Sequence, residues 1–275
     1  MLIIDAHTHI FPDKSAAKIL ESTSKKFKIK VYGKGTAADL MSHMNENRIT
    51  YAVVHMVAIH PRTVQEINTW LIAMKEPRLI KFGTIHPFAK DFKQEIQRLK
   101  ENGITGVKLQ PNVQGFDADD DRLTYPLYEA LVKSGLMVMF HVGGDPYPDV
   151  HKRSKPNMIL RIAQDFPELT IIAAHLGGLN MWTQAADVLA GRENVYMETS
   201  MTYGKIPSKL AETIIKKHGY QKIFFGTDYP FDSVKNCVKR AMDVSFLNEK
   251  EKEAVMGLNA LNLFRPEPVP NPFLH

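Results

Sequence analysis

The chain opens with the stretch Leu2-Ile3-Ile4-Asp5-Ala6-His7-Thr8-His9, in which a short apolar run ends in two histidines. Short apolar, β-branched runs of this kind are typical of strands that are buried in a parallel sheet. Similar runs recur along the whole chain. With the first run at 2–6, the others lie at 51–57, 79–85, 106–109, 137–140, 170–174, 195–198 and 223–225. The sequence therefore predicts eight short strands.

Segments with helical periodicity separate these strands. In one of them Leu123, Leu127, Ala130 and Leu131 follow the spacing i, i+4, i+7, i+8, which places all four on one helix face. The other predicted helices are 36–47, 64–75, 90–102, 158–166, 181–189, 208–218 and 234–244. Strands that alternate with crossover helices indicate an α/β protein with a parallel sheet. An open doubly wound sheet fits this alternation, but eight units can also close into a single (β/α)8 TIM barrel, which we predict.

Two segments do not follow the alternation. Residues 10–35 have no clear periodicity, and we expect a lid or an extra helix after the first strand. Residues 266–272 contain four prolines and cannot be helical, because proline lacks a backbone donor. We therefore predict a barrel domain over 1–265 and a Pro-rich C-terminal tail over 266–275.

Composition limits the class of protein. The 275 residues are 44% hydrophobic and 24% charged, which is typical of a globular protein with a large core. The net charge of +5 is dispersed without a basic stripe, which argues against a nucleic-acid partner. The single cysteine, Cys237, cannot form an internal disulfide, and we interpret it as a core residue rather than a nucleophile. Without a signal segment or membrane span, we expect a cytoplasmic protein, and a homodimer is common for such barrels.

Titratable side chains follow the apolar runs at the positions where a barrel carries its chemistry. His7 and His9 follow the first run, His141 the fifth and His175 the sixth, and Asp228 comes soon after the last. Residues two apart on a strand point to the same face, roughly 6.6 Å apart, so His7 and His9 can face one ion. Taken singly, each histidine also fits a core position, and Asp228 also fits a helix cap.

Three imidazoles and one carboxylate form a ligand set for a divalent metal. We predict His7, His9, His141 and Asp228 as ligands of Zn²⁺, with Mn²⁺, Fe²⁺ or Co²⁺ as alternatives. A metal with an open position lowers the pKa of bound water to near neutrality. The predicted catalytic groups that handle protons beside it are His175 and Asp228.

This pattern resembles the amidohydrolase superfamily, in its amidohydrolase-2 branch of small barrels similar to aminocarboxymuconate semialdehyde decarboxylase. The resemblance rests on His7-Thr8-His9, on His141, on Ala174-His175-Leu176-Gly177-Gly178 and on Gly226-Thr227-Asp228-Tyr229-Pro230, and it covers nearly the whole chain. In binuclear members a carboxylated lysine ends the fourth strand, where this chain has Lys108. We favour one ion over two, with Lys108 binding a substrate anion.

The resemblance leaves the reaction open. The leading hypothesis is hydrolysis of an ester, lactone or amide of a small organic acid by metal-activated water. The alternatives are a non-oxidative decarboxylase (a lyase) of an unsaturated or aromatic acid, and a barrel that binds metal or small molecules without turnover. The predicted substrate-binding residues are Lys108, His86 and Tyr203, and His151 is a further loop candidate.

Overall fold

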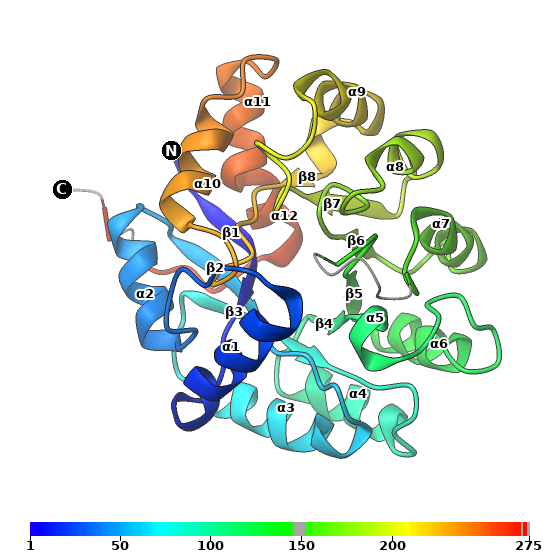
Figure 1. Cartoon of the computed structure of the whole chain (residues 1–275). Coiled ribbons are helices and arrows are strands. Elements are labelled where there is room, and N and C mark those ends of the chain that lie inside the picture. The colour runs from blue at the N-terminus through cyan, green and yellow to red at the C-terminus, as the bar shows by residue number, and fades with distance from the viewer. Residues whose placement is uncertain (146–151, 271, 274–275) are drawn as a thin grey trace.

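The computed structural model describes residues 1–145, 152–270 and 272–273, so His151 lies outside the described residues. Eight parallel strands form one sheet in the order β1 to β8 (Figure 1). They are β1 (Ile4–His9), β2 (Tyr51–His55), β3 (Leu79–Thr84), β4 (Gly106–Leu109), β5 (Met137–Phe140), β6 (Ile171–Ala173), β7 (Val195–Glu198) and β8 (Ile223–Phe224). All eight strands match predicted runs.

Hydrogen bonds between β1 and the segment after β8 close the sheet. The amide of Ala6 donates to the carbonyl of Phe225 at 2.8 Å, and the amide of His9 donates to the carbonyl of Tyr229 at 2.6 Å. Thr8 also pairs with Tyr229 in a parallel bridge. The sheet is therefore a (β/α)8 TIM barrel, as predicted, and the open doubly wound alternative is wrong.

Helices surround the strands, as Figure 1 shows. Those that match predicted segments are α2 (Ala37–Glu46), α3 (Val64–Ala73), α4 (Phe92–Glu101), α6 (Tyr125–Ser134), α7 (Pro156–Asp165), α8 (Trp182–Val188), α9 (Ser208–His218) and α10 (Val234–Met242). The segment 10–35 contains α1 (Asp13–Phe27). The helical turns that the sequence pattern missed are η1 (Pro61–Thr63), α5 (Pro111–Gln114), η2 (Tyr220–Lys222), α11 (Glu249–Glu253), the π-turn η3 (Ala254–Leu258) and α12 (Asn259–Phe264). No helix among the described residues is long and apolar enough to cross a membrane.

The first strand begins and ends later than predicted. We expected 2–6, whereas β1 is Ile4–His9, so His7 and His9 belong to the strand itself. Because His7, Thr8 and His9 are polar, a pattern based on hydrophobicity does not include the last part of the strand. Being in the strand gives both histidines a fixed backbone.

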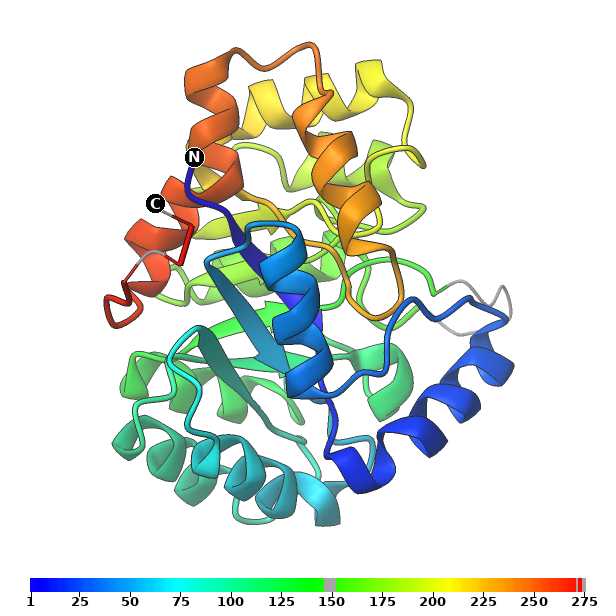
Figure 2. The same ribbon diagram turned by 90° about the vertical axis from the view of Figure 1, so that its left-hand side faces the viewer.

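The two ends of the barrel differ in their covering. Phe264 of α12 packs against Phe82 and Phe224, with ring centroids 5.7 and 5.4 Å away, and closes the N-terminal end of the strands. On the same side Tyr51 binds the tail, because its hydroxyl donates to the carbonyl of Glu267 and accepts from the amide of Val269. Figure 2 shows α1 at the opposite end. The polar cluster described next therefore lies at the α1 end.

Candidate metal centre

Strand β1 brings two imidazoles together. The Nε2 atoms of His7 and His9 lie 3.3 Å apart, as expected for alternate residues on one face of a strand. The segment after β8 adds Asp228, whose backbone amide donates to the carbonyl of His7 at 2.9 Å. Its Oδ1 lies 3.0 Å from Nε2 of His9 and 3.3 Å from Nε2 of His7. Three donor atoms thus converge on one point.

The chemistry of these donors fits a divalent metal. Nδ1 of His7 lies 2.8 Å from a carboxylate oxygen of Glu198, to which it donates, so Nε2 carries a lone pair. Ligands at 2.0–2.1 Å from a tetrahedral ion lie roughly 3.3 Å from one another, close to the separations found here. His7, His9 and Asp228 can therefore hold an ion.

His141 and His175 form a second contact. Nδ1 of His141 lies 3.0 Å from Nε2 of His175, while Nε2 of His141 lies 3.2 Å from the carbonyl of Gly144. Nδ1 of His175 lies 2.8 Å from the hydroxyl of Ser200. The predicted ligand His141 is therefore brought directly against the predicted proton-handling residue His175.

A buried glutamate, which we did not predict, connects the two groups of histidines. Glu198 accepts from Nδ1 of His7, from the amide of His175 at 2.9 Å and from the hydroxyl of Ser200 at 2.8 Å. Glu198 ends β7, as His7 and His9 end β1. The position of a charged residue at the end of a buried strand is the signal that identifies it.

Two further cationic or imidazole groups border the cluster. Nζ of Lys108, at the end of β4, lies 3.3 Å from Nε2 of His7, and burial lowers the pKa of Lys108 to about 8. His55, which ends β2, is fully buried against the rings of His7 and His9, with centroids 4.8 and 4.4 Å away. Lys108 is among the residues predicted from the sequence, whereas His55 is not.

Burial and neighbouring charges set the protonation of the cluster. Burial lowers the pKa of His9 to about 4 and, together with His141, holds the pKa of His175 well below its usual value. Burial opposes ionisation of Asp228, but His7 and His9 outweigh it and hold the pKa of Asp228 well below its usual value. Burial therefore favours the neutral form of His9 and His175, whereas Asp228 is ionised.

A cavity opens above the cluster. Its floor includes His7, His9, Lys108, His175 and Asp228, whereas its walls are mostly apolar. The apolar wall residues include Phe11, Ile19, Phe27, Met56, Leu179 and Phe231, of which Ile19 and Phe27 come from α1. Among the described lining residues, Lys108 is the only lysine or arginine. The helix that follows the first strand thus forms one wall of the cavity.

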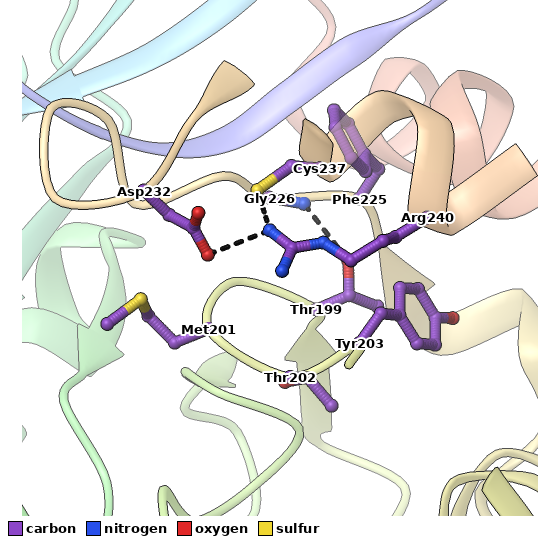
Figure 3. A pocket seen from close by; sticks show the side chains of 9 residues that line it. All are labelled: Thr199, Met201, Thr202, Tyr203, Phe225, Gly226, Asp232, Cys237 and Arg240. Atoms are coloured by element: carbon purple, nitrogen blue, oxygen red, sulfur yellow. Dashed lines mark hydrogen bonds and ion pairs between the residues drawn. The ribbon is translucent and has the colours of Figure 1, made fainter. Parts of the chain in front are cut away.

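His86 and Tyr203 lie outside the lining of this cavity. His86 is buried, and its ring lies 5.5 Å from that of Phe88 and 6.1 Å from that of Phe116. Tyr203 lines a separate small void, drawn in Figure 3. The sequence could not place these residues, since it shows which loop carries a side chain but not which way it points. Their part in substrate binding stays a prediction.

The void in Figure 3 also contains the single cysteine. Arg240 binds Asp232 through an Nη2–Oδ2 contact of 2.9 Å and lies 3.3 Å from the sulfur of Cys237. Burial raises the pKa of the Cys237 thiol to about 12, which keeps it protonated and unreactive. Cys237 is a buried core residue, as predicted.

A sequence model of the amidohydrolase family matches residues 4–265. The chain belongs to this family, in its amidohydrolase-2 branch. Among curated relatives, it is 29% identical over 182 residues to a dihydroorotase of Shewanella baltica, covering 56% of this chain and 52% of that protein. The chain thus spans about half the length of the curated relatives that it matches.

Solved structures resemble this amidohydrolase over nearly its whole length. A dihydroxybenzoic acid decarboxylase from Polaromonas, solved with manganese and the inhibitor 2-nitroresorcinol, has a TM-score of 0.70 at 16% identity over 99% of both chains. A probable 2-pyrone-4,6-dicarboxylic acid hydrolase from Acinetobacter baumannii, solved with citric acid, has a TM-score of 0.66 at 18% identity. That match covers 96% of this chain and all of the other. At these identities the likeness establishes the fold alone.

Proposed function

We propose that this amidohydrolase is a metal-dependent enzyme that hydrolyses an ester, lactone or amide of a small organic acid. The observation that carries the proposal is the convergence of His7 Nε2, His9 Nε2 and Asp228 Oδ1 within 3.3 Å of one another at the floor of the cavity. These three residues would hold a divalent ion, which supplies a Lewis acid and an activated water when bound. The family whose model matches residues 4–265 is described as amidohydrolase, which is compatible with hydrolysis.

The protein's own groups have separate parts in this proposal. Asp228 is ionised and can accept the proton that leaves the attacking water. His175 is a neutral imidazole whose backbone amide is held by Glu198, and it hydrogen-bonds the reacting group. Lys108 binds a negatively charged group of the substrate. The apolar walls exclude bulk water and strengthen these electrostatic contacts.

One ion per chain is the stoichiometry that we propose, at His7, His9 and Asp228. In this proposal Nε2 of His175 exchanges its 3.0 Å contact with Nδ1 of His141 for the reacting group when substrate binds, and no second ion is needed there. The set of imidazoles and carboxylate suits Zn²⁺ or Mn²⁺, and manganese is bound in the Polaromonas decarboxylase. Metal analysis that found two ions per chain would show that His141 and His175 also bind metal.

Decarboxylation of an unsaturated or aromatic acid is the second candidate. The apolar cavity favours it, since such walls suit an aromatic ring and destabilise a carboxylate that is to be lost. The decarboxylase from Polaromonas shares the fold over the whole chain. An organic acid is the expected substrate in both candidates, because a single buried lysine stands at the floor.

Analysis of the reaction products distinguishes hydrolysis from decarboxylation. The protein, loaded with Mn²⁺ or Zn²⁺, is incubated with lactones, amides and hydroxybenzoates, while acid release and carbon dioxide are measured. We expect acid release without carbon dioxide, at a rate that is reduced at least a hundredfold in Asp228→Asn and His175→Asn. Carbon dioxide as the product would replace hydrolysis by decarboxylation. Metal binding without turnover of any of these compounds would favour the non-catalytic alternative.

A further inference from the structure

The wall of the cavity contains a carboxylate that the proposed reaction does not use. Asp145 lines the cavity, and its side chain is only 5% exposed. Its Oδ1 accepts from Nε2 of Gln110 at 3.1 Å, and its Oδ2 accepts from Nδ2 of Asn112 at 2.8 Å. Neither donor carries a positive charge. Two neutral amides thus hold a carboxylate among mostly apolar walls.

Neighbouring groups fix both of these amides. Asn112 uses every polar atom of its side chain, because Nδ2 also donates to the carbonyl of Gly143 at 3.1 Å and Oδ1 accepts from the amide of Arg153 at 2.7 Å. The backbone amide of Gln110 donates to Oε1 of Gln114 at 2.8 Å. The carboxylate is therefore held in place without a ligand, and such preorganisation favours selective binding.

Hydrogen-bond acceptors outnumber donors at this wall. A carboxylate has about four acceptor positions, and Asp145 uses two of them with Gln110 and Asn112. Nε2 of His141 lies 3.6 Å from Oδ1 of Asp145, which is too far for a third hydrogen bond. Oε1 of Gln110 is buried and has no partner among the described residues. A ligand that brings an N–H or O–H group would supply the missing donor.

The cavity carries its positive charge at a different place. Lys108 ends β4, and Gln110 directly follows that strand with an extended φ of −131°. Residues two apart on extended backbone point to the same side, roughly 6.6 Å apart along the chain, and both of these line the cavity. A ligand that spans this distance meets an ammonium group at one end and the carboxylate beside Gln110 at the other.

We propose that Asp145 is a specificity-determining residue, which accepts a hydrogen bond from an N–H or O–H group of the substrate while Lys108 binds the acid group. The substrate is then an acid that carries an amide N–H or a hydroxyl several ångströms from its acid group. Esters and lactones without such a donor are disfavoured, because their oxygen atoms would face the carboxylate. This inference rests on the proposed function, since it takes the cavity as the substrate site.

Two probes that differ in one group test the proposal without turnover. Indole-5-carboxylate has a ring N–H where 1-benzofuran-5-carboxylate has an oxygen, and neither contains a hydrolysable bond. Calorimetric titration of the Mn²⁺-loaded protein should show roughly 10–100-fold tighter binding of the indole, as expected for a hydrogen bond to a charged group. Asp145→Ala removes both acceptor oxygens and should bind the two probes equally. Asp145→Asn, with a weaker neutral acceptor, should show an intermediate preference.

The matched control is Asp91→Asn. Asp91 also accepts from a glutamine side chain, that of Gln65, but lies outside the described lining of the cavity. This variant should keep the preference for the indole and the Mn²⁺ content of the wild type.

Three results would overturn the role of Asp145. The first is equal affinity of the wild type for both probes, or binding of neither, and the second is an unchanged preference in folded Asp145→Ala. The third is equal weakening of both probes in Asp145→Ala together with loss of Mn²⁺, which would indicate that Asp145 supports His141 instead. The proposed function fails separately, if a protein that prefers the indole releases no acid from any ester, lactone or amide.

Discussion

Glu198 holds His7 with its Nδ1 hydrogen directed away from the cluster, across a contact of 2.8 Å. The bond fixes the tautomer of His7 and leaves the Nε2 lone pair facing His9 and Asp228. Glu198 itself is fully buried, and three hydrogen bonds with His7, the His175 amide and Ser200 orient one of its oxygens. Glu198 of β7 thereby fixes the tautomer and the orientation of His7 of β1.

The substitution Glu198→Gln should weaken Mn²⁺ binding 10–100-fold, because the amide no longer enforces the tautomer of His7 and carries no charge. Calorimetric titration of the metal-free protein measures this change. Glu95→Gln is the control, since Glu95 is equally buried but binds Asn68 and Arg98. We expect Glu95→Gln to lower stability and to keep the wild-type affinity. Equal affinities in Glu198→Gln and the wild type would contradict this role.

Gly226 leaves room for the side chain of Glu198. A β-carbon added at Gly226 would lie 2.2 Å from Oε2 of Glu198 and 3.2 Å from Cβ of His7. Gly226→Ala should therefore lower the free energy of unfolding by about 1–3 kcal/mol, as overpacking does, and weaken Mn²⁺ binding at the same time. Urea denaturation and metal titration measure the two effects.

Gly103→Ala provides the comparison for Gly226→Ala. Gly103 has a φ of +75° and no atom within 4 Å of an added β-carbon, so this change strains only the backbone. It should lower stability without affecting metal affinity. A Gly226→Ala protein that binds Mn²⁺ like the wild type would show that Glu198 can move without consequence.

Lys108→Met should raise the KM for carboxylate substrates by roughly 10–100-fold, because the substrate loses a charge-assisted hydrogen bond. Neutral lactones and amides should be affected much less, because Lys108 is the only lysine or arginine among the described lining residues of the cavity. Steady-state kinetics on paired charged and neutral substrates measure the difference. Metal content is determined alongside, since Nζ of Lys108 also lies 3.3 Å from His7. An equal loss for both substrate types would argue against an anion-binding role.

His218 should make the stability of the protein depend on pH. Burial lowers its pKa from 6.5 to about 4, so the unfolded chain binds a proton that the folded chain rejects. The contribution of His218 to the free energy of unfolding is therefore constant above about pH 6.5. This free energy falls as the pH drops from 6.5 towards 4. At pH 5 the loss is on the order of 2 kcal/mol.

Urea denaturation of the metal-free protein at pH 8 and pH 5 measures the effect of His218. The variant His218→Asn keeps an acceptor for the amide of Gly191 and cannot gain the proton. It should lose less stability than the wild type over this interval. Identical losses in the two proteins would contradict the assignment.

Much of the fold could be predicted because each buried strand is largely apolar, with only single charged residues such as Lys81 in β3 and Lys108 in β4. The limits of β1 could not, since His7, Thr8 and His9 are polar yet belong to the strand. The segment of η3 and α12 was missed because no further strand follows it to complete the alternation. Its function is to close the barrel end with Phe264, a tertiary contact that no local pattern shows.

The candidate site was predictable where a titratable residue directly follows an apolar run, as His141 and His175 do. His55 escaped because the apolar residues Met56 and Val57 follow it, so that the run continues past the end of β2. The direct contact between His141 and His175 depends on how neighbouring strands place their ends, which spacing along the chain does not determine.

The attachment of the tail to Tyr51 bears on how the enzyme can be fixed to a solid support. Glu267 and Val269 lie at the N-terminal end of the strands, whereas the cavity above the candidate metal centre lies beside α1 at the other end. A resin or electrode linked through the Pro-rich tail would hold the barrel with its entrance facing the solution. Diffusion of substrate into an immobilised layer should then be unimpeded by the anchor.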